Sequence, residues 1–186
     1  MGRVSQAQAQ ENRRRVVDTA SRLFREQGTQ VSVADLMRAA GLTHGAFYKQ
    51  FTSKETLVGE ATVHAFAELA ERHTAGLAQH DGRREAAQQA LIDTYLSVEH
   101  RDDAAKGCPV AALAVDVARE GEGREARRAY TEGVADFADF LATEDQDGIV
   151  RLCALFGALV LSRATKGSPL SEEILATAHA ALTEAG

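Results

Sequence analysis

Apolar residues recur along this chain at the spacing of amphipathic helices, and no segment alternates apolar and polar residues as a strand does. In the first such stretch, Val16, Ala20 and Phe24 share one face of a helix over about residues 10–27, and Gly28 ends it. The chain has only two prolines and is rich in Ala, Leu, Glu and Arg, which favour helix. An all-α fold is therefore predicted.

Two short helices follow the first. Ser32 is a suitable N-cap for a helix that runs to about Ala40, and Gly41 can adopt the left-handed conformation that ends it. Thr43 is predicted to cap the next helix, which runs to about Gln50. Two short helices joined by a glycine-containing turn indicate a helix-turn-helix unit, although helix pairs are also common in other all-α proteins.

Six further helices complete a predicted total of about nine. The first of the six, capped by Ser53, is unbroken over about 26 residues and so spans about 40 Å, enough to join two modules. The division is predicted at this helix, with residues 1–53 as one domain and 54–186 as the other. The six helices are expected over residues 53–79, 83–101, 109–120, 122–143, 147–166 and 169–185.

Charge is distributed unevenly between these two parts. Residues 1–53 contain eight basic and four acidic side chains, whereas the remainder contains 13 basic and 23 acidic ones, for a net charge of −6. A basic N-terminal part on an acidic body indicates modules with different partners, although helix surfaces can also differ by chance.

The segment from Ile149 to Ala164 is apolar on every side, so a helix there must be covered all round. The last helix also presents apolar residues at a spacing of four. We expect these two helices to pair with their copies in a second subunit, the alternative being that they are simply the core of a monomer. The residues assigned to this homodimer interface are Leu152, Phe156, Leu159, Ile174, Ala178 and Leu182.

Several kinds of protein are excluded by what the sequence lacks. The N-terminus has no apolar signal segment, and the most apolar stretch is shorter than the roughly 20 residues of a membrane span. A cytoplasmic protein without a membrane partner is therefore expected. Cys108 and Cys153 have no metal-ligand spacing, and neither a metal nor a cofactor is expected.

No enzyme motif is recognisable. There is no Ser–His–Asp pattern, zinc motif or phosphate-binding loop. His73 and His80 could share a face of the long helix, but no further ligand accompanies them. We therefore predict no catalytic residue and no enzyme activity. A helical protein-interaction module that never binds DNA remains a second alternative.

The string "GLTHGAFYKQFTSKETL" resembles the TetR family of bacterial transcriptional repressors. The preceding strings "LFREQG" and "VSVADLMRAAG" are similar to the first and second helices of that family. The resemblance is specific over about residues 10–60, and beyond them it rests on helix pattern and length. The residues that match the family's fixed offsets are Gly41, Leu42, Thr43, Gly45, Tyr48, Phe51, Lys54 and Leu57.

This resemblance implies a homodimer that binds palindromic operator DNA through its N-terminal domain and is released by a small-molecule effector bound in the C-terminal domain. The N-terminal residues of a recognition helix contact bases, so His44, with Lys49, is predicted to reach base edges or nearby phosphate. Gly45 would let the backbone approach DNA, and the Tyr48 hydroxyl would reach phosphate. Phe47 is assigned to the core, as is Phe51. The predicted DNA-binding residues are Ser32, Val33, Thr43, His44, Gly45, Tyr48, Lys49, Gln50, Lys54 and Arg13.

Some of these assignments have alternatives. Gly45 could be a tolerated poor helix former, and the Tyr48 ring could simply pack. Arg13 belongs to a triplet of arginines that could equally be a solvated charge run. Gln50 stands where many family members have histidine, which leaves its role open.

The effector site is predicted from aromatic and polar residues of the middle helices, where most aromatics at helical spacing are core. Cys108 also suggests an alternative, a redox- or electrophile-sensing regulator, because a helix N-terminus and nearby Lys106 would favour the thiolate. Alternatively, Cys108 could simply be a small apolar residue that fills space in the core. The candidate ligand-binding residues are Phe66, Tyr95, His100, Cys108, Tyr130, Phe137, Phe140 and Phe156.

Overall fold

The computed structural model describes residues 6–119 and 124–183, and within them every element is an α-helix. The predicted all-α fold is thereby confirmed, with ten helices in the described residues where about nine were expected. The helices are α1 (Gln6–Gln27), α2 (Val33–Ala39), α3 (His44–Phe47), α4 (Lys54–Gln79), α5 (Arg84–Tyr95), α6 (Val98–Asp102), α7 (Pro109–Arg119), α8 (Glu125–Leu141), α9 (Gly148–Ala164) and α10 (Pro169–Thr183).

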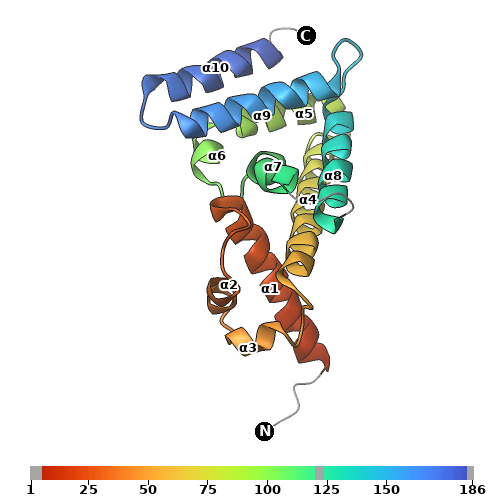
Figure 1. Ribbon diagram of the computed structural model, residues 1–186. Coiled ribbons are helices and arrows are strands. Elements are labelled where there is room, and N and C mark those ends of the chain that lie inside the picture. Colours follow the sequence, from red (N-terminus) through yellow and green to blue (C-terminus); the bar gives the residue numbers. More distant parts are fainter. Residues whose placement is uncertain (1–5, 120–123, 184–186) are drawn as a thin grey trace.

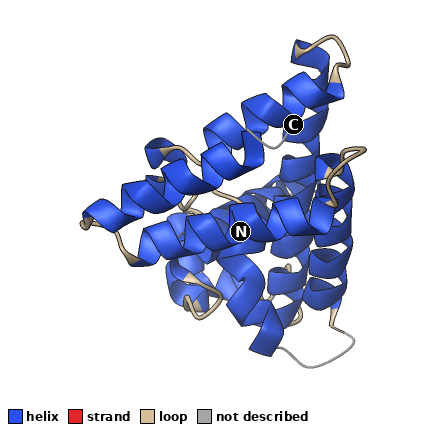
Figure 2. Ribbon diagram, turned by 90° about the horizontal axis from the view of Figure 1, so that it is seen from above, coloured by secondary structure: helices blue, strands red, loops and turns tan. Residues whose placement is uncertain are grey.

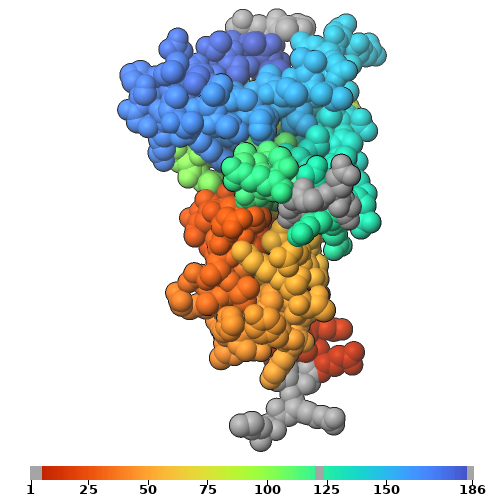
Figure 3. All heavy atoms as spheres, in the orientation of Figure 1, coloured from red at the N-terminus to blue at the C-terminus, as the bar shows by residue number. Residues whose placement is uncertain are grey.

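The molecule is elongated, with a small and a large end joined by α4 (Figure 1). Helices α1, α2 and α3 form the small end, while α9 and α10 run side by side across the large end (Figures 1 and 2). The space-filling view shows the same division, with the narrower N-terminal part below the broad C-terminal part (Figure 3). Among the described residues, no helix combines the length and hydropathy that crossing a bilayer requires.

Buried side chains form two hydrophobic clusters, one at each end of the molecule. The N-terminal cluster joins α1, α2 and α3 to the first turns of α4, and it also includes Leu113 and Val117 of α7 and Ala126 of α8. The C-terminal cluster is built from α4, α5, α8, α9 and α10, with Cys108 and Val110 from the start of α7. Helices α4, α7 and α8 therefore belong to both clusters, and a boundary at residue 53 stays a prediction.

The predicted helix starts are confirmed where a serine side chain caps them. The Ser32 hydroxyl accepts a hydrogen bond from the backbone N–H of Asp35, and the Ser53 hydroxyl accepts one from Thr56. Gly41 has a φ of +69°, the left-handed conformation expected after α2. Thr43 is the N-cap residue of α3, but its hydroxyl makes no capping hydrogen bond, contrary to the prediction.

Two helices differ from their predicted extents. The segment 83–101 is divided because the Ser97 hydroxyl accepts the backbone N–H of His100 and starts α6. Helix α3 stops at Phe47, where the backbone enters a turn in which the N–H groups of both Gln50 and Phe51 donate to the Phe47 carbonyl. The first residues of the segment predicted at 122–143 lie outside the described range, and α8 ends at Leu141.

Helix α9 is apolar on both faces, as its sequence predicts, but the two faces have different surroundings. Leu152 and Leu159 face the chain's own core and are only 4% and 0% exposed. Their assignment to a subunit interface is therefore wrong, because the periodicity of a wholly apolar helix does not tell its two faces apart. The opposite face carries an exposed apolar stripe made of Val150, Cys153, Ala154, Gly157, Val160, Leu161 and Ala164.

The remaining residues assigned to the interface are partly buried within the chain. Phe156, Ile174, Ala178 and Leu182 pack against the C-terminal cluster. Helix α10 covers one side of α9, where the Ser171 hydroxyl donates to the carbonyl oxygen of Ser162 at 2.6 Å.

Helices α1 and α4 are joined by buried polar contacts as well as by the N-terminal cluster. The guanidinium of Arg25, which is almost fully buried, donates to the carboxylate of Glu68 at 2.8 Å. His64 Nε2 lies 3.7 Å from Asp18 and 3.6 Å from the other oxygen of Glu68. These contacts fix the upper half of α1 against the long helix.

We expect Gly148→Ala to destabilise the fold. A Cβ at residue 148 would overlap the carbonyl oxygen of Ala138, because the start of α9 crosses the end of α8 at that point. The backbone would have to shift, at a cost of about 1–3 kcal/mol in the free energy of unfolding, measured by urea denaturation.

Gly76→Ala in α4 is the matched control, since a Cβ there meets no atom within 4 Å. This variant should be as stable as the parent or more stable by up to about 1 kcal/mol, because alanine favours helix. Equal effects of the two substitutions would contradict the close approach at Gly148.

Candidate nucleic-acid interface and ligand pocket

Helix α3 and the turn after it have one buried face and one exposed face. Phe47 and Phe51 are buried in the N-terminal cluster, with ring centroids 5.4 Å apart, which confirms their assignment to the core. The residues between and before them face solvent, at the end of the molecule opposite α9 and α10 (Figure 1). The exposed residues of this α3 face are Thr43, His44, Gly45, Tyr48 and Lys49.

The aromatic rings of the α3 face are held in place by neighbouring rings. Tyr48 is 66% exposed, and its ring meets the buried Phe47 ring edge-on at 5.2 Å and His44 at 5.6 Å. The phenol hydroxyl is thus presented to solvent on a fixed support. Gly45 has open space on its side-chain face, so another molecule can approach the backbone there.

The other predicted DNA-binding residues surround the α3 face. Ser32 is exposed at the N-terminus of α2, Val33 is half-buried, and Lys54 is half-buried at the start of α4. The Gln50 side chain is half-buried just beyond α3.

Arg13 is engaged inside the molecule. Its guanidinium donates to the backbone carbonyl of Gln50 and to the carboxylate of Glu60, and it lies 4.4 Å above the Phe51 ring. These contacts tie α1 to the turn after α3 and to α4. A phosphate contact by Arg13 would therefore have to share or replace the ion pair with Glu60.

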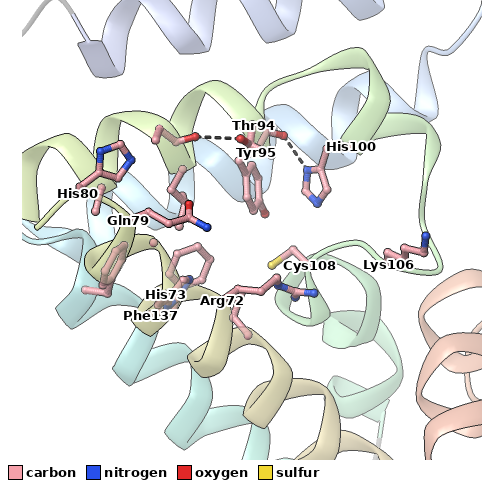
Figure 4. A pocket seen from close by; sticks show the side chains of 16 residues that line it. Arg72, His73, Gln79, His80, Thr94, Tyr95, His100, Lys106, Cys108 and Phe137 are labelled. Atoms are coloured by element: carbon pink, nitrogen blue, oxygen red, sulfur yellow. Dashed lines mark hydrogen bonds between the residues drawn. The ribbon is translucent and has the colours of Figure 1, made fainter. Parts of the chain in front are cut away.

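A pocket of about 310 Å³ lies in the C-terminal part, between α4, α5, α8 and the segment that leads into α7 (Figure 4). Its apolar wall includes Leu69, Leu91 and the rings of Phe137 and Phe140. His73 stacks on Phe140 with ring centroids 4.4 Å apart and planes 10° apart. Both the size and the mixture of apolar and polar groups suit a small organic ligand.

Five of the predicted ligand-binding residues lie together in this pocket. They are Tyr95, His100, Cys108, Phe137 and Phe140. Phe66 lines a neighbouring recess between α4 and α8 instead. Tyr130 and Phe156 line neither, because the Tyr130 hydroxyl donates to the Val110 carbonyl at 2.8 Å and Phe156 packs against the C-terminal cluster.

The sequence did not indicate the polar residues that α4 and the loop before α7 contribute to the lining of the pocket. These are Arg72, His73, Gln79, His80 and Lys106. The spacing of His73 and His80 indicated a shared face of one helix, but not that α5 crosses the same face.

Comparison with known families identifies the N-terminal part. The family model for bacterial regulatory proteins of the tetR family matches residues 16–61, which span α1 to the start of α4. Over these residues the chain matches the TetR family. Its members are transcriptional regulators and not enzymes, which agrees with the prediction of no enzyme activity.

A curated relative agrees with this match. The HTH-type transcriptional regulator AcrR of Shigella flexneri is 41% identical over 61 residues, which cover 32% of this chain and 28% of AcrR. The chain thus spans little more than a quarter of the length of that relative. The match supports the regulator class, whereas the partners of the whole protein require separate evidence.

Solved structures extend the likeness to the whole fold. The reduced form of NemR from E. coli is 20% identical with a TM-score of 0.78, covering 94% of this chain and 96% of NemR. A TetR transcriptional regulator from Chloroflexus aurantiacus is 23% identical with a TM-score of 0.73, covering 95% and 94% of the two chains. At these identities the comparison establishes the TetR fold alone.

Burial disfavours the thiolate form of Cys108. Cys108 is 2% exposed, and its burial raises the pKa of the thiol more than hydrogen bonds from Tyr95 and the start of α7 lower it. The expected thiolate is therefore not favoured in the folded protein, since Lys106 is exposed and does not offset the burial of Cys108.

Two histidines of the pocket are held neutral. Burial lowers the pKa of His73 from 6.5 to about 4, and burial also lowers the pKa of His100. The Nδ1 atom of His100 lies 2.7 Å from the Tyr95 carbonyl oxygen, which can only accept, so Nδ1 carries the proton.

Because the folded protein binds fewer protons at His73 than the unfolded chain does, stability should fall as pH decreases from about 6.5 towards about 4. The melting temperature should therefore be lower at about pH 5 than at about pH 7.5. His73→Gln should reduce that difference, whereas His44→Gln, at an exposed position, should leave it unchanged. An unaltered pH dependence in His73→Gln would contradict a buried neutral imidazole.

Proposed function

We propose that this protein is a cytoplasmic transcriptional repressor that binds palindromic operator DNA as a homodimer and leaves it when a small molecule occupies the pocket between α4, α5 and α8. The observation that carries the proposal is the α3 face, whose exposed residues project from a buried aromatic base at one end of an otherwise acidic protein.

The chemistry of the α3 face suits the DNA major groove. The imidazole of His44 and the ammonium of Lys49 can contact base edges or phosphate, and the Tyr48 hydroxyl can donate to phosphate. The Thr43 hydroxyl makes no capping bond and is free for the same purpose. Gly45 lets the backbone approach the duplex without a side chain between them.

The apolar stripe of α9 supports the homodimer. Val150 is 67% exposed and Leu161 56%, and a contiguous apolar stripe of this length is typical of an interface between subunits. Small residues along it, among them Ala154 and Gly157, let a second helix come close. A dimer through α9 and α10 would leave both α3 faces at the opposite end, free to enter two half-sites.

Helix α7 provides the route from pocket to DNA. It begins at Cys108, which lines the pocket, and its far end packs in the N-terminal cluster through Leu113 and Val117. There the Asp116 carboxylate accepts the backbone N–H of Thr29 at 2.6 Å, just after α1. A ligand that shifts the start of α7 would shift α1, and with it the spacing of the two α3 faces.

DNA binding can be tested by a gel-shift or fluorescence-anisotropy assay on the intergenic DNA beside the protein's own gene. His44→Ala should weaken specific binding by about tenfold or more, through loss of a base-edge contact, and should relax specificity at one position of each half-site. Lys49→Ala should weaken binding to all sequences and reduce its salt dependence.

Arg128→Ala, an exposed arginine of α8 remote from α3, is the matched control and should bind as the parent does. A footprint should cover two half-sites about one helical turn, or a multiple of it, apart. If the parent protein shows no specific binding in the absence of effector, the repressor proposal fails and a protein-interaction module becomes the better explanation.

The homodimer can be tested by light scattering coupled to size exclusion. Val150→Glu with Leu161→Glu places two charges on the α9 stripe and should raise the dimer dissociation constant by at least about tenfold. Val115→Glu is the control, since Val115 of α7 is 60% exposed and is not one of the stripe residues. A dimer that withstands the α9 changes and dissociates with Val115→Glu would exclude this interface.

A further inference from the structure

The pocket has a charge composition opposite to that of the whole chain. The protein has 27 acidic and 21 basic residues, yet no Asp or Glu occurs among the 16 residues that line the pocket. Its ionisable lining consists of one arginine, one lysine and three histidines, together with a tyrosine and a cysteine whose pKa values are raised and which are therefore uncharged. A site with this lining attracts anions and repels cations.

The two permanent cations of the lining lack carboxylate partners. Neither Arg72 nor Lys106 has an ion pair or a side-chain hydrogen bond within the described part of the chain. The carboxylate of Glu68, one turn before Arg72 on α4, is bonded to Arg25 at 2.8 Å. Both cations are exposed at the rim of the pocket, so a bound anion would gain their charge without breaking an existing pair.

A buried hydroxyl in the same place also lacks a suitable partner. Tyr95 is only 5% exposed, and its hydroxyl has no oxygen or nitrogen partner in the free protein. Its polar neighbour is the Cys108 thiol, which is a weak hydrogen-bonding group. Figure 4 shows the Tyr95 ring directed into the pocket towards Arg72 and Cys108. A buried hydroxyl without a hydrogen-bond acceptor is energetically costly, and a ligand that supplies an acceptor would remove that cost.

One wall of the pocket is aromatic and apolar. The His73 ring stacks on Phe140 with planes 10° apart, the Phe137 ring is tilted by 40° to His73, and Leu69 also lines the pocket. A volume of about 310 Å³ is at the small end for ligand sites and fits one or two fused rings better than a long chain. The apolar wall and the cationic rim together require a ligand with one charged end.

We propose that the effector is an aryl carboxylate of one or two rings. The carboxylate is held between the Arg72 guanidinium and the Tyr95 hydroxyl, with Lys106 adding charge at the rim, and the aryl group lies against Phe137 and Phe140. This inference rests on the proposed ligand-responsive function, and it adds the chemical class of the ligand.

The test compares three probes of the same shape by titration calorimetry on the purified full-length protein: 1-naphthoate, 1-naphthamide and 1-naphthylmethylammonium. Naphthoate should bind about tenfold more tightly than the neutral amide, and the ammonium probe more weakly still. Equal or tighter binding of the amide or ammonium probe would overturn the proposal, as would the absence of naphthoate binding at about millimolar concentration.

Variants of the proposed anion-binding residues provide the second part of the test. Arg72→Met should weaken naphthoate binding about tenfold while leaving amide binding unchanged, and Arg128→Met, outside the pocket, should change neither. Tyr95→Phe removes a hydroxyl whose polar neighbour in the free protein is the weakly hydrogen-bonding Cys108 thiol, so it should fold normally and bind naphthoate several-fold more weakly. If Arg72→Met fails to fold, Tyr95→Phe decides. Unchanged naphthoate affinity in the folded variants would overturn the proposal.

A gel shift on the same samples separates this inference from the repressor proposal. Operator binding without a preference for naphthoate would overturn the ligand class and leave the regulator intact. A preference for naphthoate in a protein that never binds operator DNA would support the ligand class and refute the repressor.

Discussion

Helix α4 must be buried in two hydrophobic clusters at once, and the rest of the architecture follows from that constraint. Its first turns pack Leu57 and Ala61 under the α3 face, and its middle packs Phe66 and Leu69 against α5 and α8. An unbroken helix is stiff over this length, so the DNA-facing end and the pocket keep a fixed relation along α4. Only an element that crosses between the clusters elsewhere can alter that relation, and α7 is such an element.

Features set by local interactions could be predicted from the sequence. Ser32, Ser53 and Gly41 act through backbone groups a few residues away, so their positions marked the helix ends correctly. The separation of α3 into a buried and an exposed face follows from helical geometry in the same way. The break at Ser97 was missed because the apolar pattern continues through Leu96 and Val98, and only the cap shows that the helix restarts.

The spacing of apolar residues could not predict features that depend on contacts between segments far apart in the sequence. Both faces of α9 are apolar, and which one meets the core depends on where α8 and α10 lie, so Leu152 and Leu159 were assigned outward in error. The aromatic residues of the pocket could be predicted, because aromatic side chains are a residue type that commonly lines ligand sites. Arg72 and His80 were not found, since charged residues on a long helix usually face solvent, and only the crossing of α5 over α4 encloses them.

The sharing of α7 between the two clusters also limits how such a regulator can be recombined. The N-terminal cluster includes Leu113 and Val117, which lie some sixty residues beyond the helix-turn-helix unit in sequence but inside its core in space. A chimera joined at residue 53 would pair one protein's operator specificity with another's α7, and the two surfaces would not match. A chimera that combines one protein's DNA site with another's effector should therefore keep the face of α7 that touches α1 together with its own N-terminal segment. DNA specificity would then be transferred by two segments that are separate in the sequence.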